Sequence, residues 1–432
     1  MPAPPVREAL ASAVAAFDAR RDALRPLLSA RRAELPLRYW RQAAHFTTPA
    51  ADAAMARKAV ESGTAPMARI LERFGVASYE LAERLAVAPD RVDAMLARPA
   101  RAPLVMLDGE DAQALRDDVT DVGLREAAAT IAEADWSGDG PPTLRTFRPP
   151  GFGLGTTARD LAAVIGALAE RGAADRLDAI IYPKIEHPEE IEALYRFLDA
   201  AEDAVGLPPQ AIRVGFLVES GWGAARLPEI ALAAIPRLCS IIYGLADYSA
   251  DLGLPAIADD HDLATWVRSE IVNVAGAAGV PSIDGMTLAY PVADPAVDAA
   301  ANRERFLERM ALVHSDAVRA RDLGMLGKWV GHPAQLFAVL LAFDAGFEPA
   351  ELEVEAAKLE AYRASVEDEA RGAAMIGGVM SDRATDRHVR VLLRRAVALG
   401  KFEPGRAAAL GVIGPGEVAE AEAIWRVTGG QT

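Results

Sequence analysis

The sequence predicts an α/β protein built on a (β/α)8 TIM barrel, with an N-terminal helical extension and a C-terminal helical cap. Short apolar runs alternate with amphipathic helical patterns over most of the chain, which is typical of repeated βαβ units in a parallel sheet. Eight such runs can be identified, and eight units favour a closed barrel. No glycine-rich phosphate-binding motif follows the early runs, which argues against the competing architecture, an open doubly wound sheet.

The segments around the barrel are predicted to be helical. Residues 1–43 carry apolar residues at three- and four-residue spacing, which predicts a helical extension ahead of the first strand. The run "HFTTP" at 45–49 predicts that first strand, and residues 50–101 form a helical insertion after it. The barrel is expected to occupy residues 44–345. Helical patterns return after the eighth strand, so residues 346–432 are predicted to form the cap.

The other seven strands are predicted from runs of aliphatic and β-branched residues. One of these runs ends at the charged residue Glu219 and is followed closely by Gly221. In a barrel, a charged residue at the end of a buried strand commonly marks a binding site. The seven runs are "APLVMLD" (102–108), "PTLRTFRPP" (142–150), "LDAIIYPK" (177–184), "IRVGFLVE" (212–219), "LCSIIYG" (238–244), "VPSIDG" (280–285) and "MLGKWVGHP" (325–333).

Composition excludes several classes of partner. The chain has 432 residues, 51% of them hydrophobic, and a formal net charge of −16, so its average surface repels nucleic acid and anionic membranes. No run of apolar residues is long enough to span a bilayer, and the first residues do not resemble a secretory signal. The single cysteine, Cys239, allows no intrachain disulfide, which fits a reducing cytoplasm. We therefore expect a cytoplasmic protein that acts on small molecules.

Charged residues gather where the predicted strands end, which is the catalytic face of a (β/α)8 barrel. Acidic residues follow strands two, five and six, and basic residues accompany strands three, four and eight. Any single acid could simply cap a helix, but their joint occurrence favours an active site. The residues are Asp108, Glu110, Asp111, Arg145, Arg148, Lys184, Glu219, Asp247, Asp251, Asp284, Lys328 and His332.

Two of these acids predict a metal site. Glu219 and Asp247 lie 28 residues apart, one βαβ repeat, so they are expected at neighbouring strand ends. Carboxylates so close repel each other unless a cation joins them. A hard divalent cation with oxygen ligands suits the pair, so we predict Mg²⁺, with Mn²⁺ as the alternative. One cysteine and six histidines in the chain argue against zinc.

Six motifs occur in an order that resembles the citrate lyase β-subunit-like aldolase superfamily, which includes malyl-CoA and citramalyl-CoA lyases and a short type of malate synthase. The resemblance covers residues 44–390. It rests on "LDGEDA", "LRTFRP", "IYPKIEHPEEI", "FLVESGWGAARLPEIA", "YGLADYSADLG" and "GMLGKWVGHPAQL".

The resemblance implies roles for the acids at the strand ends. Glu219 and Asp247 match the Mg²⁺ ligands of the family. Glu110 and Asp111 match a catalytic acidic pair near the metal and its waters.

The resemblance also implies groups that handle the substrate. Arg145 resembles the arginine that grips the carboxylate or carbonyl of the keto acid, and Lys184 and His332 match substrate-binding motif positions. Asp382 resembles the aspartate that acts as acid or base on the acyl-CoA methyl carbon. In the lyases this C-terminal segment can reach a neighbouring subunit, so a homo-oligomer, a trimer or a hexamer, is implied.

The expected reaction is reversible carbon–carbon bond formation between an acyl-CoA and a small 2-keto acid such as glyoxylate, as in a malyl-CoA lyase. A malate synthase-like reaction with thioester hydrolysis and a CoA-independent, metal-dependent pyruvate aldolase stay open. A Schiff-base aldolase through Lys184 or Lys328 is a further alternative. The non-enzymatic alternative is a barrel that only binds an acyl-CoA.

Overall fold

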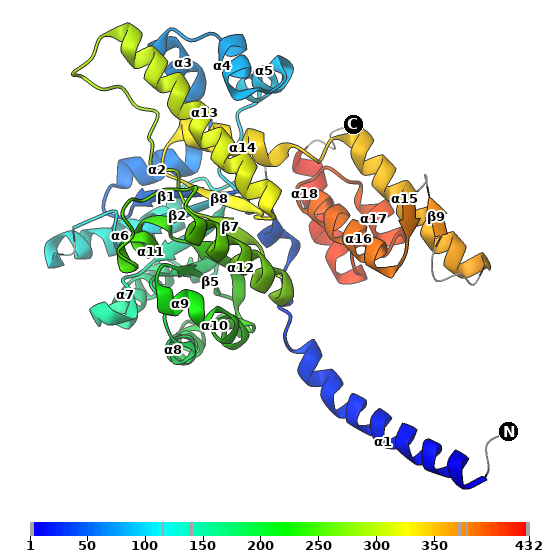
Figure 1. The fold of residues 1–432 in the computed structure, drawn as a ribbon. Helices are drawn as coiled ribbons and strands as arrows, with labels where there is room; N and C mark the ends of the chain where they lie inside the picture. The colour runs from blue at the N-terminus through cyan, green and yellow to red at the C-terminus, as the bar shows by residue number, and fades with distance from the viewer. Residues whose placement is uncertain (1–3, 115, 138–140, 370–373, 377–378, 429–432) are drawn as a thin grey trace.

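The structure is a computed structural model that describes residues 4–114, 116–137, 141–369, 374–376 and 379–428. A barrel wrapped by helices forms the body of the molecule (Figure 1). A long N-terminal helix projects away from this body (Figure 1). A compact helical lobe at the C-terminal end of the chain packs beside the barrel (Figure 1).

The barrel is closed, which confirms the predicted fold class. Each strand pairs in parallel with the next, and β1 returns to β8, with Ala44 opposite Lys328. The strands are β1 (Ala44–Pro49), β2 (Leu104–Asp108), β3 (Leu144–Arg148), β4 (Ala179–Tyr182), β5 (Arg213–Val218), β6 (Leu238–Tyr243), β7 (Ser282–Asp284) and β8 (Gly327–Val330).

The strands are apolar on both faces because both faces are covered. Every residue of β2, β4 and β6 is buried. One face of each strand fills the barrel interior and the other packs against the surrounding helices, so the sequence reads as unbroken apolar runs rather than as alternating ones.

Helices follow the strands around the barrel. Apart from the helical segment between β1 and β2, short 3-10 turns or second helices occur in the connections after β3, β5 and β6. The main helices are α6 (Asp117–Glu133), α7 (Thr157–Glu170), α8 (Pro188–Val205), α9 (Gly221–Ala225), α10 (Leu227–Ala234), α11 (Leu245–Asp251), α12 (Asp262–Ala278), α13 (Ala299–Leu323) and α14 (Pro333–Asp344).

The segment between β1 and β2 folds as a helical insertion that is fixed to α13 and α14. Phe74 stacks on Phe306 of α13 with ring centroids 4.4 Å apart, and Arg303 of α13 pairs with Glu80 at 2.5 Å. The insertion therefore rests on the helices that flank β8. It consists of α2 (Ala53–Ser62), α3 (Met67–Phe74), α4 (Ser78–Leu85) and α5 (Pro89–Ala97).

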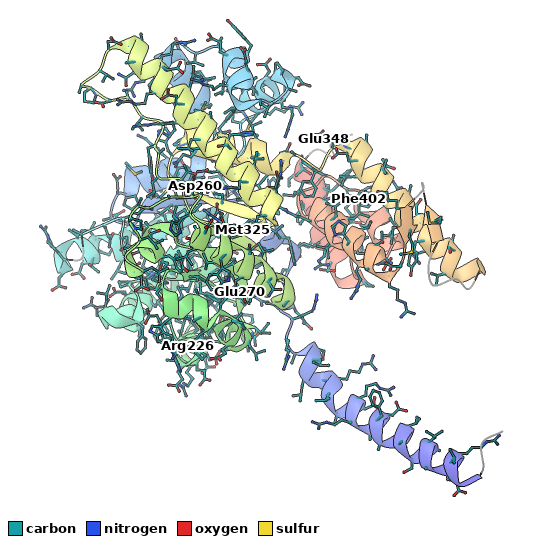
Figure 2. All side chains as sticks on the ribbon, in the orientation of Figure 1. Arg226, Asp260, Glu270, Met325, Glu348 and Phe402 are labelled. Atoms are coloured by element: carbon teal, nitrogen blue, oxygen red, sulfur yellow. The ribbon has the colours of Figure 1, made fainter. Side chains whose placement is uncertain are left out.

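The C-terminal lobe has a hydrophobic core of its own. Phe402 belongs to that core, whereas Met325 belongs to the core of the barrel (Figure 2). The lobe is built from α15 (Pro349–Glu369), the short strands β9 (Ala374–Ile376) and β10 (Val379–Ser381), α16 (Arg383–Ala398), α17 (Pro404–Ala409) and α18 (Val418–Thr428).

The lobe contacts the N-terminal ends of the barrel strands. Glu420 accepts hydrogen bonds from the backbone N–H groups of Leu37 and Arg38, at 3.1 and 3.0 Å. Arg395 donates to the carbonyl of Leu326 at 2.6 Å. Since these residues come just before β1 and β8, the lobe lies at the opposite end of the barrel from the predicted active site.

The N-terminal helix in the structure is shorter than the helical segment predicted over residues 1–43. Helix α1 (Pro4–Ser29) ends well before β1, and Pro36 precedes a separate 3-10 turn at Leu37–Arg41. The side chains of Leu10, Val14 and Phe17 are exposed along α1. Among the described helices, none has both the length and the apolar character needed to cross a membrane.

A buried ion pair between α8 and Arg237, the residue just before β6, generates a stability prediction. Arg237 contacts both carboxylate oxygens of Glu202 at 2.6 Å and the carbonyl of Ile212 at 2.9 Å, and its side chain and that of Glu202 are 1% and 2% exposed. Arg237→Met would leave a buried carboxylate without its cation, so we expect the free energy of unfolding to fall by about 3–5 kcal/mol. Urea denaturation measures the loss.

The matched control is the double variant Arg237→Met with Glu202→Gln. Removing both charges removes the unpaired carboxylate, so the double variant should lose less stability than the single variant. Equal or greater loss in the double variant would show that packing, not the unpaired charge, sets the cost.

Candidate active site

An ion pair between β2 and β3 forms the floor of the site. The register places Asp108 opposite Arg148 at the C-terminal ends of these strands. The guanidinium of Arg148 grips both oxygens of Asp108, at 2.7 and 2.5 Å, and both side chains are almost fully buried. Asp108 also accepts from the backbone N–H of Glu110 at 2.9 Å. The pair therefore fixes the start of the acidic loop after β2.

Arg148 is held as a cation by its surroundings. Burial alone would lower the pKa of Arg148, but Asp108, with Glu219 and Glu110 beside it, raises that pKa above the ordinary value. The guanidinium also lies over the ring of Trp329, 5.3 Å from its centroid. A fixed positive charge thus faces the acids at the strand ends.

Glu219 is the most deeply placed of the acids that follow β5 and β6. Its side chain is 3% exposed, and one of its oxygens accepts from the backbone N–H of Lys184 at 2.8 Å. Burial raises the pKa of Glu219 to about 8, with Asp247 adding to the rise and Arg148 opposing it. Burial thus outweighs the charge of Arg148, and a bound cation would favour the ionised form of Glu219.

Gly244 makes room for the Glu219 side chain. A Cβ atom at this position would lie 2.2 Å from Cγ of Glu219 and 2.7 Å from its Oε1. The backbone of Gly244 has a negative φ of −105°, so the glycine is required by the space that Glu219 occupies and not by its own conformation.

Lys184 places its ammonium group among the acids. Its Nζ lies 3.1 Å from Glu110, 3.0 Å from Asp111 and 3.7 Å from Asp247. The residue has a φ of +50°, a left-handed conformation that is uncommon for a residue with a side chain. This conformation lets one residue contact four acids, Glu219 through its backbone N–H and the other three through its side chain.

Glu110 has an unsatisfied oxygen. The residue is fully buried, and its Oε2 makes no hydrogen bond within the described residues, although Arg148 Nη1 lies 3.5 Å away. Burial raises the pKa of Glu110, while Arg148 opposes that rise. A buried acceptor without a donor is costly, so this oxygen is suited to a ligand or to a metal-bound water.

A cleft runs from these acids to an apolar slot. A pocket of about 380 Å³ lies between the acidic loop and the turn after β3, and a second pocket of about 320 Å³ adjoins it. Both pockets are lined by Phe152 and Glu190, and Lys184 and Glu110 line the first. The second is mostly apolar, with Leu194 and other carbon-rich side chains in its wall. An elongated ligand with a polar end and an apolar tail fits this arrangement.

The structure brings together most of the residues predicted from the sequence. Five of them surround one point at the C-terminal ends of the strands and are linked by the contacts described above. They are Glu219, Asp247, Glu110, Asp111 and Lys184.

Arg145 is a correction, because the structure places it elsewhere. It is the second residue of β3, and its guanidinium lies over Trp136, 5.5 Å from the ring centroid. Strand side chains alternate between faces, so two arginines three residues apart point to opposite sides of the sheet. Arg148 is the arginine of strand three that stands with the acids.

His332 and Asp382 lie outside the cluster. His332 caps α14, accepting from the N–H of Ala334 at 3.2 Å, and its ring meets Tyr290 edge-on. Burial lowers the pKa of His332 to about 4, so the imidazole is neutral at physiological pH. Asp382 caps α16, accepting from the N–H groups of Ala384 and Thr385, in the lobe at the other end of the barrel.

The acids fit a divalent cation in composition. Carboxylate oxygens are the ligands that Mg²⁺ prefers, and one oxygen of Glu110 has no hydrogen-bond partner among the described residues. Within the described ranges, no three acidic, histidine or cysteine side chains already converge as a ligand cluster. Three of the carboxylates here point to the Lys184 ammonium group instead.

Comparison with known proteins agrees with the fold. A family model described as "Domain of unknown function (DUF6986)" matches residues 36–422. An L-malyl-CoA/beta-methylmalyl-CoA lyase from Rhodobacter capsulatus is 28% identical over 299 residues, covering 65% of this chain and 85% of that protein. The lyase of the same name from Cereibacter sphaeroides is 29% identical over 313 residues, with 68% and 87% covered.

A solved structure supports the same architecture. The crystal structure of a citrate lyase from Burkholderia xenovorans covers 85% of this chain and 96% of its own, with a TM-score of 0.55 and 22% identity. The chain is therefore a distant homologue of carbon–carbon lyases, as the motifs predicted, and it shares their barrel fold.

Gly244→Ala tests the packing of Glu219. The added methyl group would overlap the Glu219 side chain, so we expect the carboxylate to be displaced and the free energy of unfolding to fall by about 1–3 kcal/mol. Chemical denaturation measures the stability, and a crystal structure of the variant reports the position of the carboxylate.

Gly276→Ala is the control for the same substitution. A Cβ atom at Gly276 would meet nothing within 4 Å, and the residue lies inside α12, where alanine stabilises a helix by about 0.5–1 kcal/mol relative to glycine. A Gly244→Ala protein as stable as wild type, with Glu219 unmoved, would contradict the packing argument.

Proposed function

This chain belongs to the DUF6986 family, and we propose that it is a Mg²⁺-dependent carbon–carbon lyase acting on a CoA thioester of a 3-hydroxy acid. The reaction cleaves a malyl-CoA-like substrate to an acyl-CoA and a small 2-keto acid such as glyoxylate, or runs in the condensing direction. The observation that carries the proposal is the buried Glu219 beside Asp247, facing Arg148 at the mouth of the barrel. Distant homology to malyl-CoA lyases supports the choice of reaction.

The proposed metal ligands are Glu219 and Asp247, with Glu110 and Asp111 near the metal-bound waters. When bound, the cation supplies Lewis acidity toward the keto-acid carbonyl and helps to hold the keto-acid carboxylate. Lys184 balances the same acids when the cation is absent, because its ammonium group lies within 3.7 Å of three of them.

We assign to Arg148 the substrate-binding role that the motifs suggested for Arg145. Asp108 fixes two of its nitrogens, so the guanidinium keeps one orientation as charge develops on the substrate oxygen. A donor that is already fixed needs no reorganisation during the reaction, which is the origin of most electrostatic catalysis. The apolar slot next to Phe152 is proposed to receive the acyl and pantetheine chain.

Proton transfer at the acyl-CoA carbon is proposed to use Asp382 from another copy of the chain. In the cleavage direction the substrate hydroxyl gives its proton to a base of the acidic cluster and becomes the keto-acid carbonyl as the carbon–carbon bond breaks. The electron pair of that bond stays on the acyl-CoA as its enolate, and the enolate carbon then takes a proton from the carboxyl group of Asp382. The lobe that carries Asp382 packs at the far end of its own barrel, so this role requires a homo-oligomer. A trimer or a hexamer is the assembly that the family resemblance implies.

The direct test is incubation of the protein with Mg²⁺ and malyl-CoA-type esters, with acyl-CoA and keto acid measured by mass spectrometry. Glu219→Gln should lower kcat/KM by about a hundredfold or more. Mutating residues that only hydrogen-bond to a metal ligand already reduces metal affinity or activity by about 10–100-fold, and Glu219 is proposed to bind the metal directly. Chelation by EDTA should abolish the activity, and Mg²⁺ should restore it.

Glu229→Gln is the matched control, because Glu229 lies exposed on α10, soon after β5. It should retain full activity. The metal assignment would be overturned, in favour of a lysine-based aldolase, if activity survived both EDTA and Glu219→Gln. Covalent attachment of the substrate to a lysine after borohydride reduction would have the same meaning. Release of free CoA together with the acid would instead indicate the synthase reaction.

Lys184→Met tests the relation between the lysine and the metal. Removing a positive charge that neighbours three carboxylates should tighten Mg²⁺ binding by about fivefold, the effect of roughly 1 kcal/mol of Coulomb repulsion. Isothermal titration calorimetry on the substrate-free protein measures this affinity without reference to turnover.

Lys58→Met, on the exposed surface of α2, removes the same charge at a distance and should leave the affinity unchanged. Weaker Mg²⁺ binding in Lys184→Met than in wild type would show that the lysine shapes the site instead of competing with the cation.

A further inference from the structure

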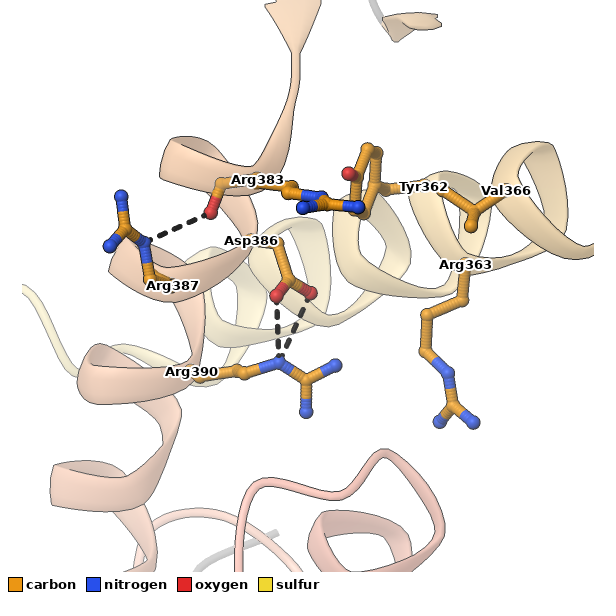
Figure 3. A pocket seen from close by; sticks show the side chains of 7 residues that line it. All are labelled: Tyr362, Arg363, Val366, Arg383, Asp386, Arg387 and Arg390. Carbon is orange, nitrogen blue, oxygen red and sulfur yellow. Dashed lines mark hydrogen bonds and ion pairs between the residues drawn. The ribbon is translucent and has the colours of Figure 1, made fainter. Parts of the chain in front are cut away.

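The C-terminal lobe contains a pocket between α15 and α16 that the proposed reaction does not use (Figure 3). Its volume is about 520 Å³, which lies within the range of small-molecule sites. Four arginines and one aspartate line it in a chain with a net charge of −16. The lining residues are Tyr362, Arg363, Val366, Arg383, Asp386, Arg387 and Arg390.

The sequence of α16 places three of these arginines along one side of the helix. Arg383, Arg387 and Arg390 are separated by four and three residues, the spacing that aligns side chains on one helical face. Arg363 comes from α15, which packs against α16. Two helices thus contribute positive charge to the same space, and this charge favours an anionic ligand.

Two of the arginines are fixed by main-chain carbonyls. Arg363 Nη1 donates to the carbonyl of Ala409 at 2.8 Å, and Arg390 Nη1 donates to those of Leu410 and Gly411, both at 2.8 Å. The end of α17 therefore holds side chains from both pocket helices, so little side-chain entropy is lost when a ligand binds.

Gly411 and Asp386 complete this support. Gly411 has a φ of +67°, and a Cβ atom there would lie 3.2 Å from Arg390 Nη1, so a side chain at this position would crowd the guanidinium. Asp386 accepts from Arg390 Nε at 3.0 Å, and Figure 3 shows this pair at the edge of the space between the helices.

The pocket has an apolar wall beside its charges. Tyr362 is largely buried and Val366 is exposed, and both lie on α15, as Arg363 does. Guanidinium groups bind phosphate through paired hydrogen bonds, and an aromatic ring offers a surface for a planar base. The lining therefore combines the two features that a nucleotide needs.

We propose that this pocket binds the diphosphate of an adenine nucleotide, with the phosphates on the arginines and the base against Tyr362. The site is separate from the barrel and does not depend on the proposed lyase reaction. A 5′-diphosphate occurs both in free ADP and in the nucleotide end of CoA, so either molecule could supply the ligand.

Calorimetry of the full chain with pyrophosphate, ADP, dephospho-CoA and CoA, at low ionic strength and in EDTA, tests the proposal. Wild type should bind ADP more tightly than pyrophosphate, because only ADP carries a base. Arg387→Glu should weaken both ligands by at least about tenfold, the effect of losing one charge-assisted contact. Tyr362→Leu should weaken ADP and leave pyrophosphate unchanged. Comparing CoA and dephospho-CoA with ADP identifies the source.

Arg426→Glu is a matched control. Arg426 is exposed on α18 of the same lobe, and its Nε donates to the carbonyl four residues earlier at 3.3 Å, as Arg387 Nε does on α16. This control and Glu219→Gln should bind as wild type does, which keeps the result independent of the lyase site. No binding to wild type, equal weakening in Arg387→Glu and Arg426→Glu, or binding of an oligo-glutamate peptide in place of pyrophosphate would overturn the proposal.

Discussion

A carboxylate buried at the mouth of the barrel is the constraint on which the rest of the site depends. Glu219 is almost inaccessible to water, and burial raises its pKa to about 8. Ionising such a group requires positive charge nearby. The chain supplies that charge through Arg148 and through the backbone N–H of Lys184, and it leaves Gly244 without a side chain so that the carboxylate can fit.

The positive charges at the site differ in how firmly they are held. Arg148 is buried and gripped by both oxygens of Asp108, so its position is fixed. The side chain of Lys184 is 37% exposed, and two of the three acids that it contacts, Asp111 and Asp247, are partly exposed themselves. A flexible ammonium group can give way to a divalent cation, whereas a paired guanidinium cannot. This difference suits a site with a permanent anchor for substrate and an exchangeable cation.

The fold and the acids could be predicted, whereas the contacts around them could not. Apolar runs revealed the strands, and the spacing of Glu219 and Asp247 placed both on neighbouring strand ends. To decide whether Arg145 or Arg148 lies with the acids, one must know on which face and near which end of β3 each residue lies. The limits of a strand predicted from sequence are too uncertain to give this. The left-handed backbone of Lys184 depends on a loop. Gly244, next to strand six, was a signal that sequence reasoning missed.

The topology of the barrel decides where the C-terminal lobe can act. Helix α14 starts at the catalytic face and runs back along the barrel, as the last helix of this fold must, so the chain leaves the barrel at the face opposite the acids. The contacts of Leu37 and Leu326 then hold the lobe at that face. Any group of the lobe that takes part in chemistry at strand ends must therefore reach those of another copy. Assembly is in this sense a condition for the proposed reaction, because the barrel alone carries the acids and the lobe carries Asp382.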